Sequence, residues 1–555
     1  MKQKTGLYGA WCIFSVILFI FGLSIAQYFI WSDLFVQEFD ADVAESVIWA
    51  QAAVESGKLV NPDFYYTHLL PFGGQIIFIP IVRHFGVTLY ALRLGMSICS
   101  ALFGLVLAGF FYALGWEFPG ALTSAGLMLL FLSGTKRLRD IFWSHVVHYN
   151  LSLFYLLTAF IFLSLLLRKD RKKHLIGLIG LEVSLILGTT NDIAVVLFFP
   201  ITLFCAAALE QFLDGGIRGF FRKEKITFLA EIAGGIIAGF VLRYILTAHA
   251  STAYAEIFSN LSPAESWTSN LSMFLRHWVS MFTVLPEQQV PIFSSVGIKL
   301  MIRIVLALLV IAVSVRSFFV YRTVSSRPER MFLCAHWVIC AEILFFFVFG
   351  VISNMNWRII PMFFTSLVTA LIILKADFSS FSDRGPAAQL LDLGTALFTA
   401  VYAAICCVTV FHQSISTASW FGQKTILKTL ADHSLTYGYN LDYWFGNSIT
   451  VLTDDRIKVR EVILRNGKLS PSYHQSNIHW YEDQPGIDRY FLVCQEDEYW
   501  AHPEFAEGAI EIYRADQERT FVDGEVGFFI FVYDHNIFTN EDGVFDTVFG
   551  KNADQ

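Results

Sequence analysis

Residues 39–64 read FDADVAESVIWAQAAVESGKLVNPDF and follow directly on an apolar run at residues 7–31. From Asp42 to Ser56 the apolar and polar residues recur at helical spacing, which predicts an amphipathic helix with Glu45 on its polar side. Asp40 stands where the residue that caps such a helix is expected. An apolar span followed at once by this helix indicates a surface helix that lies along a membrane.

The composition of the whole chain is that of a membrane protein. Of its 555 residues, 55% are hydrophobic and 15% charged, and the mean hydropathy is +0.55. A soluble domain has roughly 45–50% and 25% of these residues. The net charge is −8, from 39 Lys and Arg against 47 Asp and Glu. Without a concentrated basic face, the chain is a poor partner for nucleic acid.

Apolar runs of about 20 residues predict transmembrane helices. We expect about eleven spans, at residues 7–31, 88–113, 118–134, 146–167, 175–190, 192–212, 227–247, 297–316, 331–352, 359–374 and 389–411. The apolar run at 71–85 is shorter and contains Gly73, Gly74 and Pro80, so it favours an interfacial or re-entrant helix. The expected fold class is therefore a polytopic α-helical membrane protein.

The distribution of Lys and Arg predicts the orientation. With the N-terminus in the cytoplasm, the cytoplasmic loops carry 17 of these cations and the external loops 7, in agreement with the positive-inside rule. An odd number of spans then puts the C-terminus outside. We expect a transmembrane domain at 1–411 with a first external loop at 32–87, a soluble extracytoplasmic domain at 412–555, and a multi-pass protein of the cytoplasmic membrane.

The C-terminal segment is expected to be a β-rich or α+β domain. Residues 437–462 and 526–534 are rich in Val, Ile and aromatic residues, which is typical of strands. This domain has no internal disulfide bond, because Cys494 is its one cysteine. Its many aromatic side chains either pack in its core or form a platform for sugar rings, and the sequence leaves both interpretations open.

Side chains suited to acid–base or metal chemistry gather in the loops expected outside. The loop at 135–150, TKRLRDIFWSHVVHYN, is rich in cations, acids and imidazoles, and a short link between two spans ends in an acid. We expect the following residues to support a site: Glu45, Arg139, Asp140, His145, His148 and Asp192.

Asp40 and Asp42 are the candidate catalytic residues. A carboxylate at a lipid–water boundary is partly desolvated, which raises its pKa toward that of a general base. A divalent cation, Mg²⁺ or Mn²⁺, is a candidate cofactor, with Asp42, Asp140 and His145 as its ligands. The alternative is that these acids only cap helices.

Arginines near the external ends of spans are candidates for binding phosphate. Arg within a membrane is costly and usually faces a cavity or a partner, and its guanidinium matches the oxygens of a phosphate. Arg358 and Arg243 are the two such residues that we expect at the site.

The first loop also resembles that of a known superfamily. The acidic motif at Asp40–Asp42, then W-A-x-A-x-x-x-S-G ending at Gly57, then P-D-F, is similar to the GT-C membrane glycosyltransferases, which include protein O-mannosyltransferases and the lipid A aminoarabinose transferase. The phrase FGVTLYALRLGMSICSALFG at 85–104 and the sequence Asn356–Pro361 resemble two further motifs of that superfamily. The resemblance covers roughly residues 1–375.

This resemblance implies a GT-C-like fold and a polyprenyl-phosphate-linked sugar donor. The sugar would pass to a hydroxyl of a glycan, lipid or protein acceptor at the outer face of the bilayer. The resemblance gives Asp40 or Asp42 the role of base and Arg358 that of a ligand for the donor phosphate. A transporter or lipid flippase, and a non-catalytic scaffold of the cell envelope, remain as alternatives.

Overall fold

A computed structural model describes most of the chain: residues 2–252, 260–283, 285–286, 288–351, 355–379, 385–412, 418–442, 445–465, 468–472, 474–518 and 525–539. These residues form two compact units. The helical unit contains residues 1–28, 100–245 and 255–413, and the loop–tail unit contains residues 29–99, 246–254 and 414–555. The expected division at residues 411 and 412 stays a prediction, while the structure groups the first loop with the tail.

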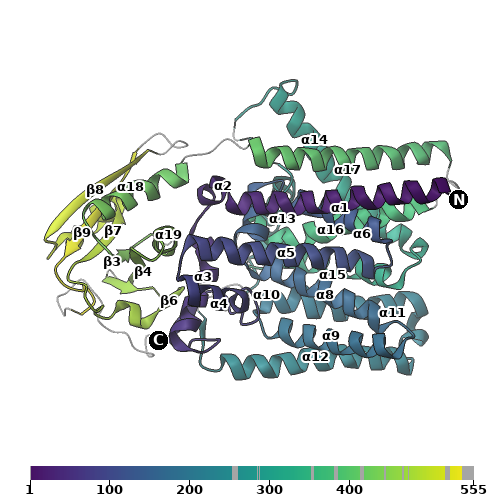
Figure 1. The fold of residues 1–555 in the computed structure, drawn as a ribbon, viewed down its shortest axis with the longest axis horizontal. Helices are drawn as coiled ribbons and strands as arrows, with labels where there is room; N and C mark the ends of the chain where they lie inside the picture. Colours follow the sequence, from purple (N-terminus) through teal and green to yellow (C-terminus); the bar gives the residue numbers. More distant parts are fainter. Residues whose placement is uncertain are drawn as a thin grey trace. The chain divides into compact units, whose positions relative to one another are not determined.

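Long helices run side by side through the helical unit (Figure 1). In chain order these long helices and the short helices between them are α1 (Lys2–Trp31), α5 (Leu89–Ala113), α6 (Phe118–Leu132), α7 (Lys136–Arg139), η1 (Asp140–Ser144), α8 (His148–Leu166), α9 (Arg171–Thr189), α10 (Ile193–Val196), η2 (Leu197–Ile201), α11 (Thr202–Phe220), α12 (Lys223–Thr247), η3 (Ala264–Ser266), α13 (Trp267–Ser280), α14 (Ser295–Val320), η4 (Tyr321–Thr323), α15 (Arg327–Phe349), η5 (Asn356–Ile359), α16 (Ile360–Ser379) and α17 (Pro386–His412).

The polytopic fold class is confirmed, and all eleven expected spans are helical. Within the described residues, nine helices are long and apolar enough to cross a membrane, or ten if the bent pair of α6 with α7 and η1 counts as one span. The remaining helix is α9, which begins with Arg171, Lys172 and Lys173 and contains Glu182, so its composition is less apolar. The run at 71–85 forms only the eleven-residue helix α4 (Gln75–Phe85), which is too short to span.

A sharp bend after α6 forms the loop that carries several candidate residues. The chain turns by 114° between α6 and the segment made of α7 and η1. At this turn a Cβ on Gly134 would lie 2.5 Å from Cys406 Sγ, so only glycine fits against α17. Thr135 caps α7 by accepting a hydrogen bond from Leu138 N, and Asn150 ties the end of the loop back by donating to Ile141 O and His145 O.

The loop–tail unit contains two sheets and the helices around them. Its elements are α2 (Asp33–Gln37), α3 (Ala41–Ser56), β1 (Phe64–Tyr66), α4, β2 (Ser251–Thr252), α18 (Ala418–Asp432), β3 (Tyr437–Asn440), α19 (Gly446–Leu452), β4 (Lys458–Arg465), β5 (Lys468–Pro471), β6 (Ser476–Asn477), η7 (Ile478–Tyr481), β7 (Tyr490–Gln495), α20 (Glu496–Ala501), η8 (Pro503–Ala506), β8 (Glu511–Glu518) and β9 (Glu525–Tyr533).

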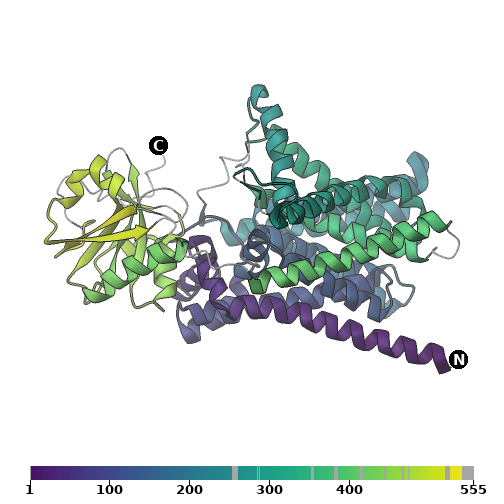
Figure 2. The same ribbon diagram turned by 90° about the horizontal axis from the view of Figure 1, so that it is seen from above.

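The α+β expectation for the tail is confirmed. Six strands form one sheet in the order β5-β4-β3-β7-β9-β8, and α18 lies along it (Figure 2). The core beneath α18 and α19 includes Ile426, Leu430, Val459, Phe491 and Ile530.

The stretch at 437–462 is not strand throughout. Gly446–Leu452 forms α19, although this segment is rich in β-branched residues. The neighbouring strands β3 and β4 are parallel, and parallel strands require a crossover connection, usually a helix. Here the topology overrides the local strand propensity.

The aromatic side chains of the tail are mainly core residues. Tyr437, Tyr439, Trp480 and Tyr481 are each at most 6% exposed. Their hydroxyls are used inside the domain: Tyr437 donates to Trp480 O and Tyr439 to Asn536. These residues therefore pack the domain and offer no open platform, while Tyr443, Trp444 and Tyr473 lie outside the described residues.

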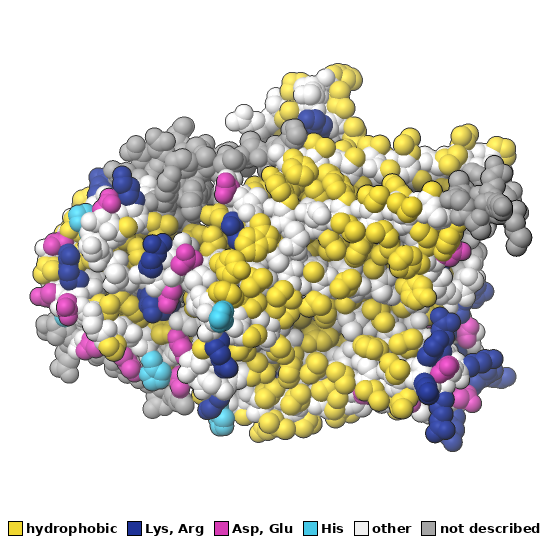
Figure 3. Space-filling model, in the orientation of Figure 1, with side chains coloured by type: hydrophobic (Ala, Val, Ile, Leu, Met, Phe, Trp, Pro, Cys, Tyr) yellow, Lys and Arg dark blue, Asp and Glu magenta, His cyan; other side chains and the backbone are white. Residues whose placement is uncertain are grey.

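The surface of the helical unit has the distribution of side chains expected of a membrane-spanning protein. Apolar side chains cover its flank, and Lys and Arg side chains gather at one end (Figure 3). The exposed cations of the loops at 168–173 and 218–225 belong to the group that the sequence assigns to the cytoplasm.

Candidate functional site

Three helices begin at the same end of the helical unit, and candidate residues lie at each start. His148 is the first residue of α8, Asp192 precedes α10, and Arg358 lies in η5 immediately before α16. α8 packs against both α10 and α16. Because the start of a long helix carries partial positive charge, the starts of α8 and α16 favour an anion nearby.

Arg358 is held by a residue that the sequence did not single out. Its NH1 donates a hydrogen bond of 2.8 Å to the hydroxyl of Tyr149, the second residue of α8. Asp192 is close enough to interact electrostatically with the same tyrosine. Arg358 is only partly buried, so its side chain is held in place by Tyr149 without being enclosed.

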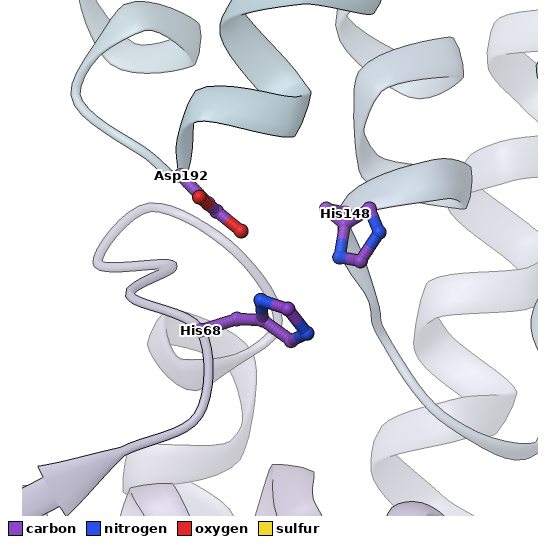
Figure 4. A group of neighbouring side chains, drawn as sticks. All are labelled: His68, His148 and Asp192. Atoms are coloured by element: carbon purple, nitrogen blue, oxygen red, sulfur yellow. The ribbon is translucent and has the colours of Figure 1, made fainter. Parts of the chain in front are cut away.

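His148 and Asp192 form a pair beside this arginine. A ring nitrogen of His148 and a carboxylate oxygen of Asp192 lie within 4.8 Å of one another. Figure 4 shows both side chains, each at the start of its helix. The imidazole of His148 also contacts the ring of Tyr149 at a tilt of 55°, with centroids 3.9 Å apart.

The loop after α6 contributes a second set of charges. Arg137 NH1 binds Asp140 Oδ2 at 2.6 Å, and Asp140 Oδ1 lies 3.6 Å from His145 Nδ1. The guanidinium of Arg137 lies over the ring of Trp357, 4.3 Å from its centroid. Trp357 adjoins Arg358 in the chain, so this set of charges neighbours the set around Arg358. The two sets together are called the cluster below, and they contain Asp140, His145, His148, Asp192 and Arg358.

Two arginines do not join this cluster. Arg139 is fully buried and donates to Ser133 O at 3.1 Å, at the end of α6. It points away because it lies two residues after Arg137 on the same helix, whereas Asp140, three residues on, shares the face of Arg137. Arg243 lies near the end of α12, half-buried, and makes no hydrogen bond or ion pair within the described residues.

The acids of the first loop lie in the loop–tail unit. Asp40 caps α3 as expected, and its Oδ1 accepts a hydrogen bond of 3.2 Å from Val43 N. Gly57 ends the helix with a φ of +68°, which favours glycine. Asp40 and Asp42 are both partly exposed. Their convergence with Arg358 in one cavity stays a prediction.

The sequence predicts Glu45 on the polar side of α3, but the structure places it on a buried side. It is 4% exposed, because α19 of the tail packs against this helix. Gln475 Nε2 donates to Glu45 Oε1, and Asn447 Nδ2 donates to Gln475 Oε1 at 3.4 Å, which fixes the orientation of that amide. Gln475 adopts a φ of +49°, a conformation that costs a non-glycine residue strain and persists only where its surroundings enforce it.

Burial governs the charge of Glu45. Loss of water, and then the nearby Asp42 and Asp40 carboxylates, raise the pKa of Glu45 well above its usual 4.5. The folded protein thus keeps a proton on Glu45 over a pH range in which the unfolded chain has released it. Stability from this proton is present in full below about pH 4.5 and decreases as the pH rises from there toward the raised pKa of the folded protein.

The substitution Glu45→Gln should remove this pH dependence. Glutamine keeps the acceptor for Gln475 but has no proton to lose. As the pH rises above 4.5, the wild type loses the stability that the Glu45 proton contributes, so the melting temperature of the variant should increase relative to that of the wild type. Thermal unfolding in detergent at several pH values measures this. Glu55→Gln, an exposed position on the same helix, is the matched control and should follow the wild type. A constant difference between Glu45→Gln and wild type across these pH values would contradict a buried neutral Glu45.

Comparison with solved structures identifies the fold. The chain is similar to the crystal structure of ArnT from Cupriavidus metallidurans in the apo state, with a TM-score of 0.51 at 11% sequence identity over 95% of this chain and 98% of that chain. The fold is GT-C-like. A structure of the same ArnT bound to undecaprenyl phosphate gives a TM-score of 0.49 at 12% identity, over 93% and 97% of the two chains.

ArnT is the lipid A aminoarabinose transferase, a GT-C glycosyltransferase. The resemblance that the first loop indicated is therefore confirmed at the level of the fold. No family model and no curated protein matches the sequence.

The donor atoms of the cluster allow a test of the divalent cation expected from the sequence. His148 with Asp192, and His145 with Asp140, each pair one imidazole nitrogen with one carboxylate oxygen, and Asp140 Oδ1 and His145 Nδ1 are buried without a hydrogen bond to any described residue. Mg²⁺ is bound almost entirely by oxygen ligands. Mn²⁺ also prefers oxygen but, as a transition-metal ion, accepts an imidazole nitrogen more readily than Mg²⁺ does. The residues fit Mn²⁺ better than Mg²⁺, and Asp42 lies in the other unit. A bound Mn²⁺ would add positive charge for an anionic substrate.

Mn²⁺ at a concentration 100 times its dissociation constant should raise the free energy of unfolding of the purified protein by about 2.7 kcal/mol. Its melting temperature should rise accordingly. His148→Ala removes one ligand and should reduce or abolish this shift, while His479→Ala, at a 55% exposed side chain in the tail, should not. Differential scanning fluorimetry with Mn²⁺ and Mg²⁺ in parallel checks both points. An equal or larger effect of Mg²⁺ would argue against an imidazole-containing site.

Tyr149 and Arg137 are the members of the cluster that the sequence alone did not reveal. Arg137 could have been found, because its three-residue spacing from Asp140 puts the two side chains on one helical face. Tyr149 could not, since 209 residues separate it from Arg358 and a tyrosine at the start of an apolar span is ordinary.

Proposed function

We propose that this protein is a GT-C-type glycosyltransferase, which moves a sugar from a polyprenyl-phosphate carrier to a hydroxyl of a glycan, lipid or protein. The observation that carries the proposal is the position of Arg358. It stands at the start of α16 in a GT-C-like fold, held by Tyr149 and accompanied by Arg137. ArnT, which has this fold, is known in complex with undecaprenyl phosphate, and we assign the same class of lipid to this chain.

Electrostatics makes this cluster suitable for a phosphate that leaves. Arg358, whose hydrogen-bond partner Tyr149 is uncharged, and the starts of α8 and α16 direct positive charge to one end of the helical unit, while Arg137 there is paired with Asp140. As the bond between the sugar and the phosphate breaks, negative charge grows on the phosphate oxygens. Donors already fixed in place stabilise that charge more than the charge of the intact donor, which lowers the barrier.

The base in this proposal is Asp40, with Asp42 beside it. The acceptor oxygen forms a bond to the anomeric carbon, the bond from that carbon to the phosphate oxygen breaks, and the hydroxyl proton passes to the Asp40 carboxylate. Polyprenyl phosphate leaves with the bonding electrons. Burial raises the pKa of Glu45, which favours its neutral form beside the two aspartates.

The experiment that tests the proposal is transfer by the purified full chain in detergent. A set of radiolabelled polyprenyl-phosphate sugars is offered with membrane glycolipids as acceptors, and release of free polyprenyl phosphate is measured. We expect release with at least one donor, dependent on acceptor and strongly reduced with Arg358→Ala. Release that is unaffected by Arg358→Ala would contradict the assignment of the site.

We place the cluster and the tail outside the cytoplasmic membrane. A lipid-linked donor reaches the outer face already flipped, so an enzyme that uses it there requires no nucleotide-sugar domain. A single cysteine introduced at an exposed tail position, Lys468→Cys in a cysteine-free background, should then be labelled by a membrane-impermeant maleimide in intact spheroplasts. A cysteine at Lys169, in the basic loop between α8 and α9, is the matched control and should be labelled only after lysis. The reverse pattern would invert the topology and overturn the assignment to the outer face.

A further inference from the structure

An apolar groove runs along the helical unit away from the candidate site. It lies between α14, α16 and α17 over part of α6, and its cavity volume is about 220 Å³. The lining is apolar apart from the hydroxyls of Thr395, Thr399 and Tyr402 and one ion pair. Phe131 and Tyr402 line it at the end away from the ion pair, with ring centroids 5.3 Å apart.

The groove is as long as one leaflet of a membrane is deep. Along α14 its lining extends from Leu306 to Arg316, and along α16 from Leu367 to Asp377. Each stretch is ten residues of helix, or about 15 Å. The hydrocarbon core of a bilayer is about 30 Å thick, so the groove reaches from the edge of the core to its midplane.

The end of the groove at the edge of the hydrocarbon core is charged. Arg316 NH1 and NH2 donate to the two carboxylate oxygens of Asp377, both at 2.7 Å. The arginine side chain is 36% exposed and the described residues give it no other acceptor, although a guanidinium has five N–H donors. Arg316 therefore keeps N–H donors for an anionic group, and the Asp377 carboxylate lies directly beside it.

The charged end lies on the membrane face opposite the candidate site. Arg358 immediately precedes α16, whereas Asp377 lies near the end of that 20-residue helix. A helix of this length extends about 30 Å, the thickness of the hydrocarbon core. A donor whose phosphate binds Arg358 therefore belongs to the other leaflet and does not have its head group at this groove.

We propose that the groove binds one acyl chain of a glycerophospholipid with a primary amine in its head group, such as phosphatidylethanolamine. The chain fills the apolar part down to Phe131, the phosphate accepts hydrogen bonds from Arg316, and the ammonium approaches Asp377. The phosphate of an anionic phospholipid could also bind Arg316, but its head group has no ammonium to offset the charge of Asp377. The pair therefore disfavours an anionic phospholipid relative to one with an amine. This inference does not depend on the sugar transfer proposed above.

Native mass spectrometry of the full chain in mixed micelles of detergent with phosphatidylethanolamine or phosphatidylglycerol tests the proposal. The wild type should retain one phosphatidylethanolamine in preference to phosphatidylglycerol. Ala370→Trp and Thr399→Trp fill the groove from two different helices, leave the ion pair intact, and should each lower this retention about tenfold or more. Ile237→Trp, at a 63% exposed position on α12, is the matched control and should retain lipid as the wild type does.

Asp377→Asn tests the head group separately. It removes the partner of the ammonium but leaves Arg316 for the phosphate, so the preference for phosphatidylethanolamine should fall while lipid is still bound. Equal retention of both lipids by the wild type would overturn the head-group assignment. Wild-type retention by both tryptophan variants would overturn the groove as a lipid site. Should one tryptophan variant fail to fold, the other still tests the groove, because the two side chains enter it from different helices.

Discussion

Replacement of Asp40 by asparagine should lower sugar transfer by about 10²–10⁴-fold, the range expected when a general base is removed. Asparagine has nearly the size of aspartate and cannot accept the acceptor's proton. It is also as good a helix cap, so the hydrogen bond from Val43 N and the start of α3 should survive. The loss should therefore fall on turnover, with donor binding and melting temperature close to those of the wild type.

Two further variants separate the base from its surroundings. Asp42→Asn should lose less activity unless Asp42 shares the proton, and the two losses should not add, because groups that act as one unit rarely do. Asp33→Asn, at an exposed acid in α2, is the matched control and should leave transfer unchanged. Turnover of Asp40→Asn near the wild-type level would shift the role of base to Asp42, and no loss in either variant would refute transfer by this site.

The features of the fold that depend on local sequence were predictable. Apolar runs of the right length located the spans, and the acid, the apolar spacing and the glycine located α3 from Asp40 to Gly57. The short run at 71–85 could be separated from the spans by length alone. Each of these inferences needs only neighbouring residues, because helix formation and capping are local.

The features that depend on distant contacts were not predictable. Glu45 has the spacing of an exposed residue, and only the packing of α19 and the amide of Gln475, 430 residues away, make it buried. The segment Gly446–Leu452 has strand propensity and becomes a helix because the strands beside it are parallel. Tertiary contacts overrode local preference at both places.

Arg358→Ala should weaken donor binding more than it affects any other property of the protein. A hydrogen bond between charged groups contributes about 1.5–3 kcal/mol, which corresponds to about 10–100-fold in the dissociation constant for polyprenyl phosphate. Arg358 is only partly buried, and the Tyr149 hydroxyl that accepts its hydrogen bond is neutral. The protein should therefore stay folded.

The size of the effect in related variants distinguishes a phosphate ligand from a structural arginine. Arg358→Lys keeps the charge but loses the planar fork, so it should bind the donor between the wild type and the alanine variant. Tyr149→Phe removes only the hydroxyl that orients the guanidinium, and should cost less than Arg358→Ala. Arg276→Ala, at an exposed arginine of α13, is the matched control and should bind as the wild type does. A binding isotherm for polyprenyl phosphate measures all four. If Arg358→Ala and Arg276→Ala bound equally well, the phosphate would have to lie elsewhere, and Arg137 over Trp357 would be the next residue to test.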